Sequence, residues 1–112
     1  MPHYSEDSGI ISINSLDTRI LAVLLHGPSN GYAVARQCEA DANKLITIAT
    51  SNVYKALPRL EELMLISLYQ QSTSDKGNGR LYRITSLGKL LLRQEVTALK
   101  TFTKIAEDRL GN

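Results

Sequence analysis

Apolar residues recur every three or four positions along residues 49–69, which predicts an amphipathic helix. The apolar positions are Val53, Ala56, Leu57, Leu60, Leu63 and Met64. Polar residues repeat with the same spacing on another face, namely Asn52, Lys55, Arg59 and Glu62. Thr50 precedes the run, where its hydroxyl would cap the helix. The helix therefore has an apolar back and a front whose side chains suit phosphates and base edges.

Two short apolar segments follow this helix directly, at residues 63–69 and 80–85. The segment between them, STSDKGNG at residues 72–79, has the composition of a turn. Leu81 and Ile84 are the core candidates on the second strand, although their odd spacing does not place both on one face. A helix followed by a two-stranded ribbon predicts a winged helix-turn-helix.

Two shorter helices are predicted before the amphipathic one. Ser15 would cap the first, and Gly27-Pro28 would end it. Ser29 or Asn30 would cap the second, which extends to about residue 42. The predicted fold class is therefore mainly α with a small β-hairpin wing.

The C-terminal part of the chain predicts one long helix, capped by Thr85 and running from residue 86 to about residue 110. At about 25 residues it would be ~37 Å long, which exceeds what one small core can cover. Its apolar stripe is also too wide for a single contact. The surplus is expected to pack against a second copy, and the alternative is a helix folded back on its own domain. The residues assigned to dimerisation are Leu92, Val96, Leu99, Phe102, Ala106 and Leu110.

These elements suggest a three-part organisation of the 112 residues. Residues 1–14 would form an N-terminal arm, residues 15–85 a winged-helix DNA-binding domain, and residues 86–112 a C-terminal dimerisation helix. The segment 44–104 holds ten Lys and Arg against four Asp and Glu, whereas residues 1–43 hold two against five. A basic surface of this kind favours a polyanionic partner, and ordinary solvated Lys and Arg are the alternative.

Several other classes of protein lack support in the sequence. No apolar run approaches the ~20 residues of a membrane span and no basic-then-apolar leader is present, so we expect a cytoplasmic protein without a membrane partner. Cys38 is the only cysteine, and its spacing from His3 and His26 fits no standard ligand motif, so no metal is expected. No nucleotide-binding loop or catalytic constellation accompanies these residues. We therefore expect no cofactor and no enzymatic activity.

The motifs, taken in order, resemble the PadR family of transcriptional regulators. They are Gly27-Pro28, Gly31-Tyr32, Val53-Tyr54-x-Ala56-Leu57-x-Arg59-Leu60-Glu61, Tyr82-x-Ile84-Thr85 and Gly88. The resemblance covers about residues 15–90. It implies a homodimer joined by C-terminal helices that binds pseudo-palindromic operators in double-stranded DNA, mostly as a repressor. It also makes residues 50–64 the recognition helix and residues 72–79 the wing. A MarR-like regulator is an alternative with the same fold.

The candidate DNA-binding residues lie on the recognition helix and the wing. They are Ser51, Asn52, Tyr54, Lys55, Arg59, Lys76 and Arg80. Asn52 suits adenine edges or phosphate, and Lys55 and Arg59 suit phosphate, with guanine as a second target for arginine. Each has an alternative structural role: capping for Asn52, a surface helix face for Lys55 and Arg59, half-burial for Tyr54, and a solvated hairpin for the wing residues. Arg36 and Lys44 are weaker phosphate candidates.

Two features depart from the family pattern. Pro58 lies inside the predicted recognition helix, where it removes one backbone hydrogen bond, so we predict a kink or break between Tyr54 and Pro58. The wing carries only Lys76 and Arg80. Both features favour a rival function, a winged-helix protein-interaction module that does not bind DNA. A small-molecule effector acting at the dimer interface would be the natural release signal, although no effector site is visible in the sequence.

Overall fold

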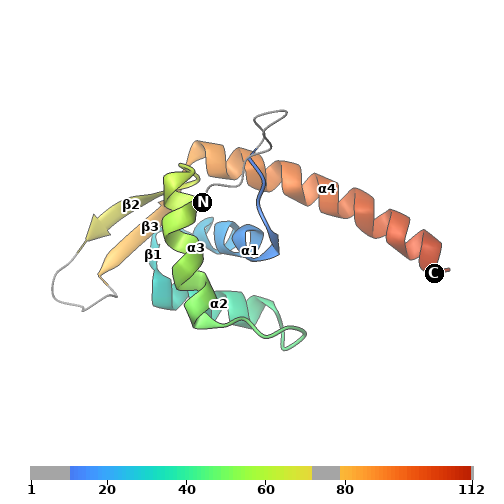
Figure 1. Cartoon of the computed structure of the whole chain (residues 1–112), viewed down its shortest axis with the longest axis horizontal. Coiled ribbons are helices and arrows are strands. Elements are labelled where there is room, and N and C mark those ends of the chain that lie inside the picture. The colour runs from blue at the N-terminus through green and yellow to red at the C-terminus, as the bar shows by residue number, and fades with distance from the viewer. Residues whose placement is uncertain (1–10, 72–78, 112) are drawn as a thin grey trace.

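The structure is a computed structural model that describes residues 11–71 and 79–111. Its elements are α1 (Ser15–Leu24), β1 (Ser29–Asn30), α2 (Gly31–Asp41), α3 (Thr50–Glu62), β2 (Ile66–Gln71), β3 (Arg80–Ile84) and α4 (Ser86–Leu110). The strands form an antiparallel sheet in the order β1-β3-β2. α1, α2 and α3 lie beside this sheet, and α4 extends away from them as one long rod (Figure 1). The predicted fold class, mainly α with a small wing and a long C-terminal helix, is confirmed.

The start of α1 is fixed by a reciprocal pair of hydrogen bonds. The Asp17 backbone N–H donates to Asn14 Oδ1 over 2.8 Å, and the Asn14 backbone N–H donates to Asp17 Oδ2 over 2.9 Å. This capping box satisfies two N–H groups that have no partner within the helix. The prediction that Ser15 caps the helix is therefore wrong by one position, because Ser15 is already the first helical residue.

The caps predicted for the other three helices agree with the structure in two cases and differ in one. Asn30 caps α2 by accepting from the Ala33 N–H over 2.8 Å, which confirms one of the two predicted caps. Thr85 caps α4 by accepting from the Gly88 N–H. α3 begins after Ala49, which has no side-chain capping bond, so the prediction of Thr50 as a cap is wrong.

α3 is continuous through Pro58, and the predicted break between Tyr54 and Pro58 is wrong. Proline removes only its own backbone donor, and the helix is held by its apolar face. Val53, Leu57 and Leu60 are fully buried against the rest of the core. The helix stops at Glu62, and Met64 then adopts a left-handed backbone conformation with φ of 65°. That residue turns the chain into β2.

The wing strands differ from the sequence expectation in which residues face the core. Tyr82 and Ile84 of β3 are buried, two residues apart, as strand alternation requires. Leu81 lies on the other face and is only partly buried, so its assignment to the core is wrong. β1, two residues long, pairs with β3 through Ser29 opposite Tyr82. Sequence patterning missed this strand because two residues carry no periodicity.

The junction of α3, β2 and α4 is held by one threonine. The Thr85 hydroxyl donates to the Met64 carbonyl over 2.7 Å and accepts from the Gly88 N–H over 3.0 Å. The Thr85 backbone N–H donates to the Leu65 carbonyl over 3.0 Å. A Cβ added at Gly88 would collide with that same Leu65 carbonyl oxygen. Glycine is therefore what allows the first turn of α4 to approach the end of α3 closely.

α4 contributes the buried Leu92 to the core of its own chain, and the partly buried Leu91 packs against that core. Leu92 is 6% exposed and packs in that core, so its assignment to dimerisation is wrong. Beyond Leu92 no described residue of the helix is buried, and Phe102 is 63% exposed. Within residues 11–71 and 79–111, no helix is both long and apolar enough to cross a membrane.

Gly88→Ala tests the close approach of α4 to Leu65. In an ordinary helix interior, alanine is more stable than glycine by about 1 kcal/mol. Here we expect the opposite sign, with a loss of more than ~2 kcal/mol in the free energy of unfolding, because the added methyl group displaces a backbone carbonyl. Denaturant unfolding at fixed protein concentration measures the change. Thr101→Ala, at an exposed position of the same helix, is the control and should change stability by less than ~0.5 kcal/mol.

Candidate nucleic-acid interface

The N-terminal half of α3 presents a polar surface to solvent. Ser51, Asn52 and Lys55 are all exposed, while their neighbours Val53 and Ala56 are buried. This follows from the helical phase: positions 51, 52 and 55 share one side, and the apolar positions turn inward. The exposed side chains offer a hydroxyl, an amide and an ammonium group, which suit phosphate oxygens and base edges. The prediction that Asn52 and Lys55 lie on the polar face of the helix agrees with their exposure.

Tyr54 lies at the edge of this surface, 41% exposed, where its ring packs on the start of α2. A Cβ built on Gly31 would be 2.6 Å from Tyr54 Cε1, so a side chain at position 31 would force the Tyr54 ring to move from the point where the two helices touch. This contact explains why Gly31-Tyr32 and Tyr54 belong to one pattern. It fixes the ring in place while leaving part of it accessible.

A second aromatic and basic pair lies at the start of α2. Arg36 Nη1 donates to the Tyr32 hydroxyl over 3.1 Å, and the guanidinium carbon lies 5.8 Å from the centroid of the Tyr32 ring. Both residues are exposed. Sequence reasoning ranked Arg36 low and omitted Tyr32. Their spacing of four residues on a helix was the available signal.

Arg59 does not share the exposed surface. Its guanidinium forms a salt bridge and a hydrogen bond with Asp17 of α1, whose side chain is 0% exposed, and Arg59 itself is only 20% exposed. If Arg59 turned outward to bind a phosphate, the Asp17 carboxylate would be left buried without a partner, which is strongly destabilising. The prediction that Arg59 faces outward beside Lys55 is therefore wrong, and its position links α3 to α1.

Arg80, at the root of the wing, is held by two neighbours. Its Nε donates to the Tyr82 hydroxyl over 2.9 Å, and its Nη2 lies 3.4 Å from Glu61 Oε1. The hydrogen bond that Arg80 donates to the Tyr82 hydroxyl is the main cause that raises the pKa of Arg80, with the Glu61 carboxylate adding to it. Arg80 thus remains charged at the surface, although Glu61 offsets part of that charge. Lys76, the other wing candidate, lies outside the described residues.

Comparison with known proteins identifies the family of this winged helix. The model of the transcriptional regulator PadR-like family matches residues 20–94. The chain belongs to the PadR-like family. An uncharacterized protein X from Lysinibacillus sphaericus is 35% identical over 81 residues, which are 72% of this chain and 74% of that protein. The family match decides in favour of a PadR-like rather than a MarR-like regulator.

Solved PadR-like structures share the fold described above. A transcriptional regulator from Clostridium thermocellum is 26% identical, with a TM-score of 0.73 over 87% of this chain and 97% of that one. Bacillus subtilis PadR, solved in complex with operator DNA, is 21% identical. Its TM-score is 0.66, over 76% of this chain and 47% of that chain. At this identity the likeness concerns the fold.

The residues that the structure describes give little support for metal binding or for nucleophilic catalysis. Within the described residues, no group of three or more His, Cys, Asp and Glu side chains is placed to hold a metal ion. Cys38 is fully buried in the core. Burial, and secondarily the Asp41 carboxylate, raises the pKa of its thiol to about 11. The thiolate that nucleophilic or metal chemistry needs is therefore disfavoured at this position.

Arg59→Ala and Lys55→Ala compare the two basic residues one turn apart on α3. We expect Arg59→Ala to lower the free energy of unfolding by about 3 kcal/mol, because Asp17 is left buried without its partner. Lys55→Ala should change it by less than ~0.5 kcal/mol, because Lys55 is exposed. Denaturant unfolding of both variants measures the difference. Equal effects would contradict the assignment of Arg59 to the core.

Proposed function

We propose that this PadR-like chain is a homodimeric repressor that binds a pseudo-palindromic operator in double-stranded DNA. The observation that carries the proposal is the exposed polar face of α3, on which Ser51, Asn52 and Lys55 lie together without an acidic neighbour on the first two turns. Family membership supports the regulatory role. We propose that the protein is not an enzyme. We expect it to act in the cytoplasm, where its operator would be.

Each residue of the α3 surface has a role in this proposal. Asn52 would read base edges in the major groove, because its amide can donate and accept in one bidentate contact with adenine. Lys55 would neutralise phosphate, and the Ser51 hydroxyl and Tyr54 would add phosphate contacts. Arg80 and Lys76 would extend the contact through the wing. Arg59 is excluded from this set because it pairs with Asp17.

The dimer would form along α4. Val96, Leu99, Phe102 and Leu110 are large apolar residues that stay exposed among the residues the structure describes, on a helix that projects from the body (Figure 1). Ala106 lies on the same side, at helical spacing from Leu99 and Leu110. In this proposal residues 15–85 form the DNA-binding domain and residues 86–112 the dimerisation helix. The two α3 helices would then enter successive major grooves, ~34–36 Å apart.

Lys55→Ala and Asn52→Ala test the α3 surface directly. The purified protein is titrated onto DNA from upstream of its own gene at several salt concentrations, with random DNA as competitor. Lys55→Ala should reduce the slope of log affinity against log salt by about two, one for each protomer. The reason is that each phosphate contact that is lost reduces the number of counterions released on binding. Asn52→Ala should lower affinity for the operator about tenfold and leave binding to random DNA unchanged.

Lys104→Ala is the matched control for the DNA-binding variants. Lys104 is an exposed basic residue on α4, far along the chain from α3, so its loss removes the same charge from another surface. Its salt slope should equal that of the original protein. The α3 assignment would be refuted by equal slopes for Lys55→Ala and Lys104→Ala.

Leu99→Asp tests the dimer. A carboxylate at the centre of the apolar side of α4 would have to be buried without a partner, so the protein should sediment as a monomer of 12.4 kDa. Thr97→Asp places the same charge on the opposite side of the helix and should leave the dimer intact. Sedimentation equilibrium measures both variants. A dimer that survives Leu99→Asp would place the interface elsewhere.

A protein-interaction module is the second candidate function. It is favoured by the small number of uncommitted basic residues near α3, because Arg59 and Arg80 are both engaged in salt bridges. Pro58 no longer favours it, since α3 is continuous. The two functions differ in the DNA titration: a module of this kind would show no binding even at low salt, and Lys55→Ala would have nothing to weaken.

A further inference from the structure

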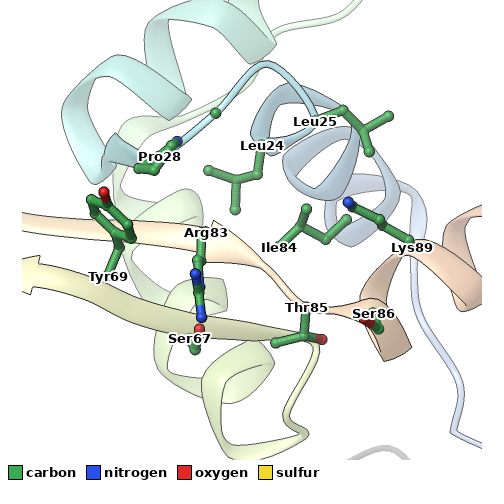
Figure 2. Close-up of a pocket in the computed structure, with 11 residues that line it drawn as sticks. Leu24, Leu25, Pro28, Ser67, Tyr69, Arg83, Ile84, Thr85, Ser86 and Lys89 are labelled. Carbon is green, nitrogen blue, oxygen red and sulfur yellow. The ribbon is translucent and has the colours of Figure 1, made fainter.

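A pocket of about 220 Å³ lies between the start of α1, the loop that precedes α3 and the beginning of α3. Arg19 of α1 and Asn52 of α3 both line it. It is separate from the larger pocket, of about 570 Å³, that lies beside the wing sheet and is lined by Arg83 and Lys89 (Figure 2). The smaller pocket therefore joins Asn52, part of the proposed DNA surface, to a helix from which that proposal takes no DNA contact.

The two edges of the exposed side of α3 border different parts of the molecule. Asn52 and Arg59 are seven residues apart, which is about two helical turns, so they share one edge. Arg59 is paired with α1. Tyr54 and Glu61 share the other edge by the same spacing, where Tyr54 lies against the start of α2 and Glu61 pairs with the root of the wing. One edge of α3 thus borders α1, and the other borders α2 and the wing.

A helix that enters the major groove brings both of its edges close to the DNA backbone. An α-helix with its side chains is ~10–12 Å wide and the major groove is ~12 Å wide, so the helix fills the groove from one strand to the other. Side chains beside each edge of α3 then face the phosphates of a different strand. On the α2 edge, Tyr54 is available for this contact. On the α1 edge, Arg19 is the cation that lines the pocket beside Asn52.

The surroundings of Arg19 suit a phosphate group. The lining of the pocket contains no Asp or Glu, and Ser15 and Thr47 add two hydroxyl groups. Within the described residues, no salt bridge includes Arg19. Charge-assisted hydrogen bonds from a guanidinium to phosphate oxygens are about twice as strong as those between neutral groups. The Arg19 side chain is also partly buried, so fixing it costs less conformational entropy than fixing a fully exposed arginine.

We propose that Arg19 binds an operator phosphate at the mouth of this pocket, on the strand opposite the one that Tyr54 contacts. This inference rests on the proposed DNA-binding function and extends the DNA surface to α1, outside the helix-turn-helix and the wing. Arg19 is a positioning residue, because a phosphate contact carries no sequence information and sets the register of the protein on the duplex. The Asp17–Arg59 pair holds α1 against α3 and so keeps Arg19 beside Asn52.

Arg19→Gln tests this contact. Glutamine keeps most of the aliphatic part of the side chain and removes the charge. The slope of log affinity against log salt is measured on a random-sequence duplex, because phosphate contacts do not depend on the base sequence. Arg19→Gln should reduce this slope by about two for a dimer, one for each protomer. Arg19→Lys should keep the slope of the original protein, because lysine retains the charge.

Arg93→Gln is the matched control. Arg93 is an exposed arginine on α4, so this variant loses the same charge away from the pocket beside Asn52. Its slope should equal that of the original protein. The proposal is overturned if Arg19→Gln keeps the original slope or lowers it no more than Arg93→Gln does. Arg19→Gln should also weaken binding to operator and random DNA by the same factor, so that their ratio stays within about twofold.

Ethylation interference on the operator duplex locates the phosphate itself. Positions at which an ethylated phosphate prevents binding mark the backbone contacts of the original protein. Arg19→Gln should lose one such position in each half-site, and Tyr54→Phe should lose one on the facing strand across the major groove. An unchanged pattern for Arg19→Gln, or loss of positions on the same strand by both variants, would overturn the proposal.

These outcomes separate the inference from the proposed function. An original protein that binds no duplex even at low salt overturns both. DNA binding whose salt slope depends on Lys55 and not on Arg19 supports the proposed function and overturns only the contact from α1.

Discussion

The buried Asp17 carboxylate is the constraint on which the arrangement of the helices depends. One of its oxygens closes the capping box that starts α1, and the other accepts from Arg59 of α3. A fully buried carboxylate requires such partners, because a buried charge without them would cost several kcal/mol. The beginning of α1 and the last turn of α3 are therefore tied together at one point. Arg59 ties α3 to α1, and the apolar side of α3 lies in the core. The side of α3 that faces solvent is therefore the one that carries Ser51, Asn52 and Lys55.

A small number of contacts also holds the chain at the C-terminal end of α3. Thr85 bonds Met64 and Gly88, and the missing side chain of Gly88 lets α4 come against the Leu65 carbonyl. The chain just after the C-terminal end of α3 and the first turn of α4 thus meet across a few backbone groups. The pocket beside Arg83 and Lys89 borders the same junction.

Much of the fold could be predicted because its signals are local. Helical periodicity located α3 and α4, turn composition located the wing, and the phase of α3 predicted the exposure of Asn52 and Lys55. What failed depended on distant partners or on single positions. Arg59 finds its carboxylate 42 residues away, so its spacing from Lys55 could not reveal its role. Leu92 has the same periodicity as Leu99, yet only Leu92 lies in the core, on the part of the molecule where α4 contacts α1. Pro58 looked disruptive because its local cost was visible and the burial that outweighs it was not. The residues of the pocket beside Asn52 come from α1, α3 and the loop before α3, so they had no common signal in the sequence.

The central claim is that the N-terminal half of α3 is the surface that meets DNA. Amide chemical shifts of the isotope-labelled full-length protein, followed while operator duplex is added, test it most directly. The account predicts that the largest shifts fall on residues 50–55 and that wing residues follow. Amides of the buried residues of α1 should move little, because the Asp17–Arg59 pair stays in place. Tight binding of DNA with shifts confined to α4 or to the pocket beside Arg83 and Lys89, and none on residues 50–55, would contradict it.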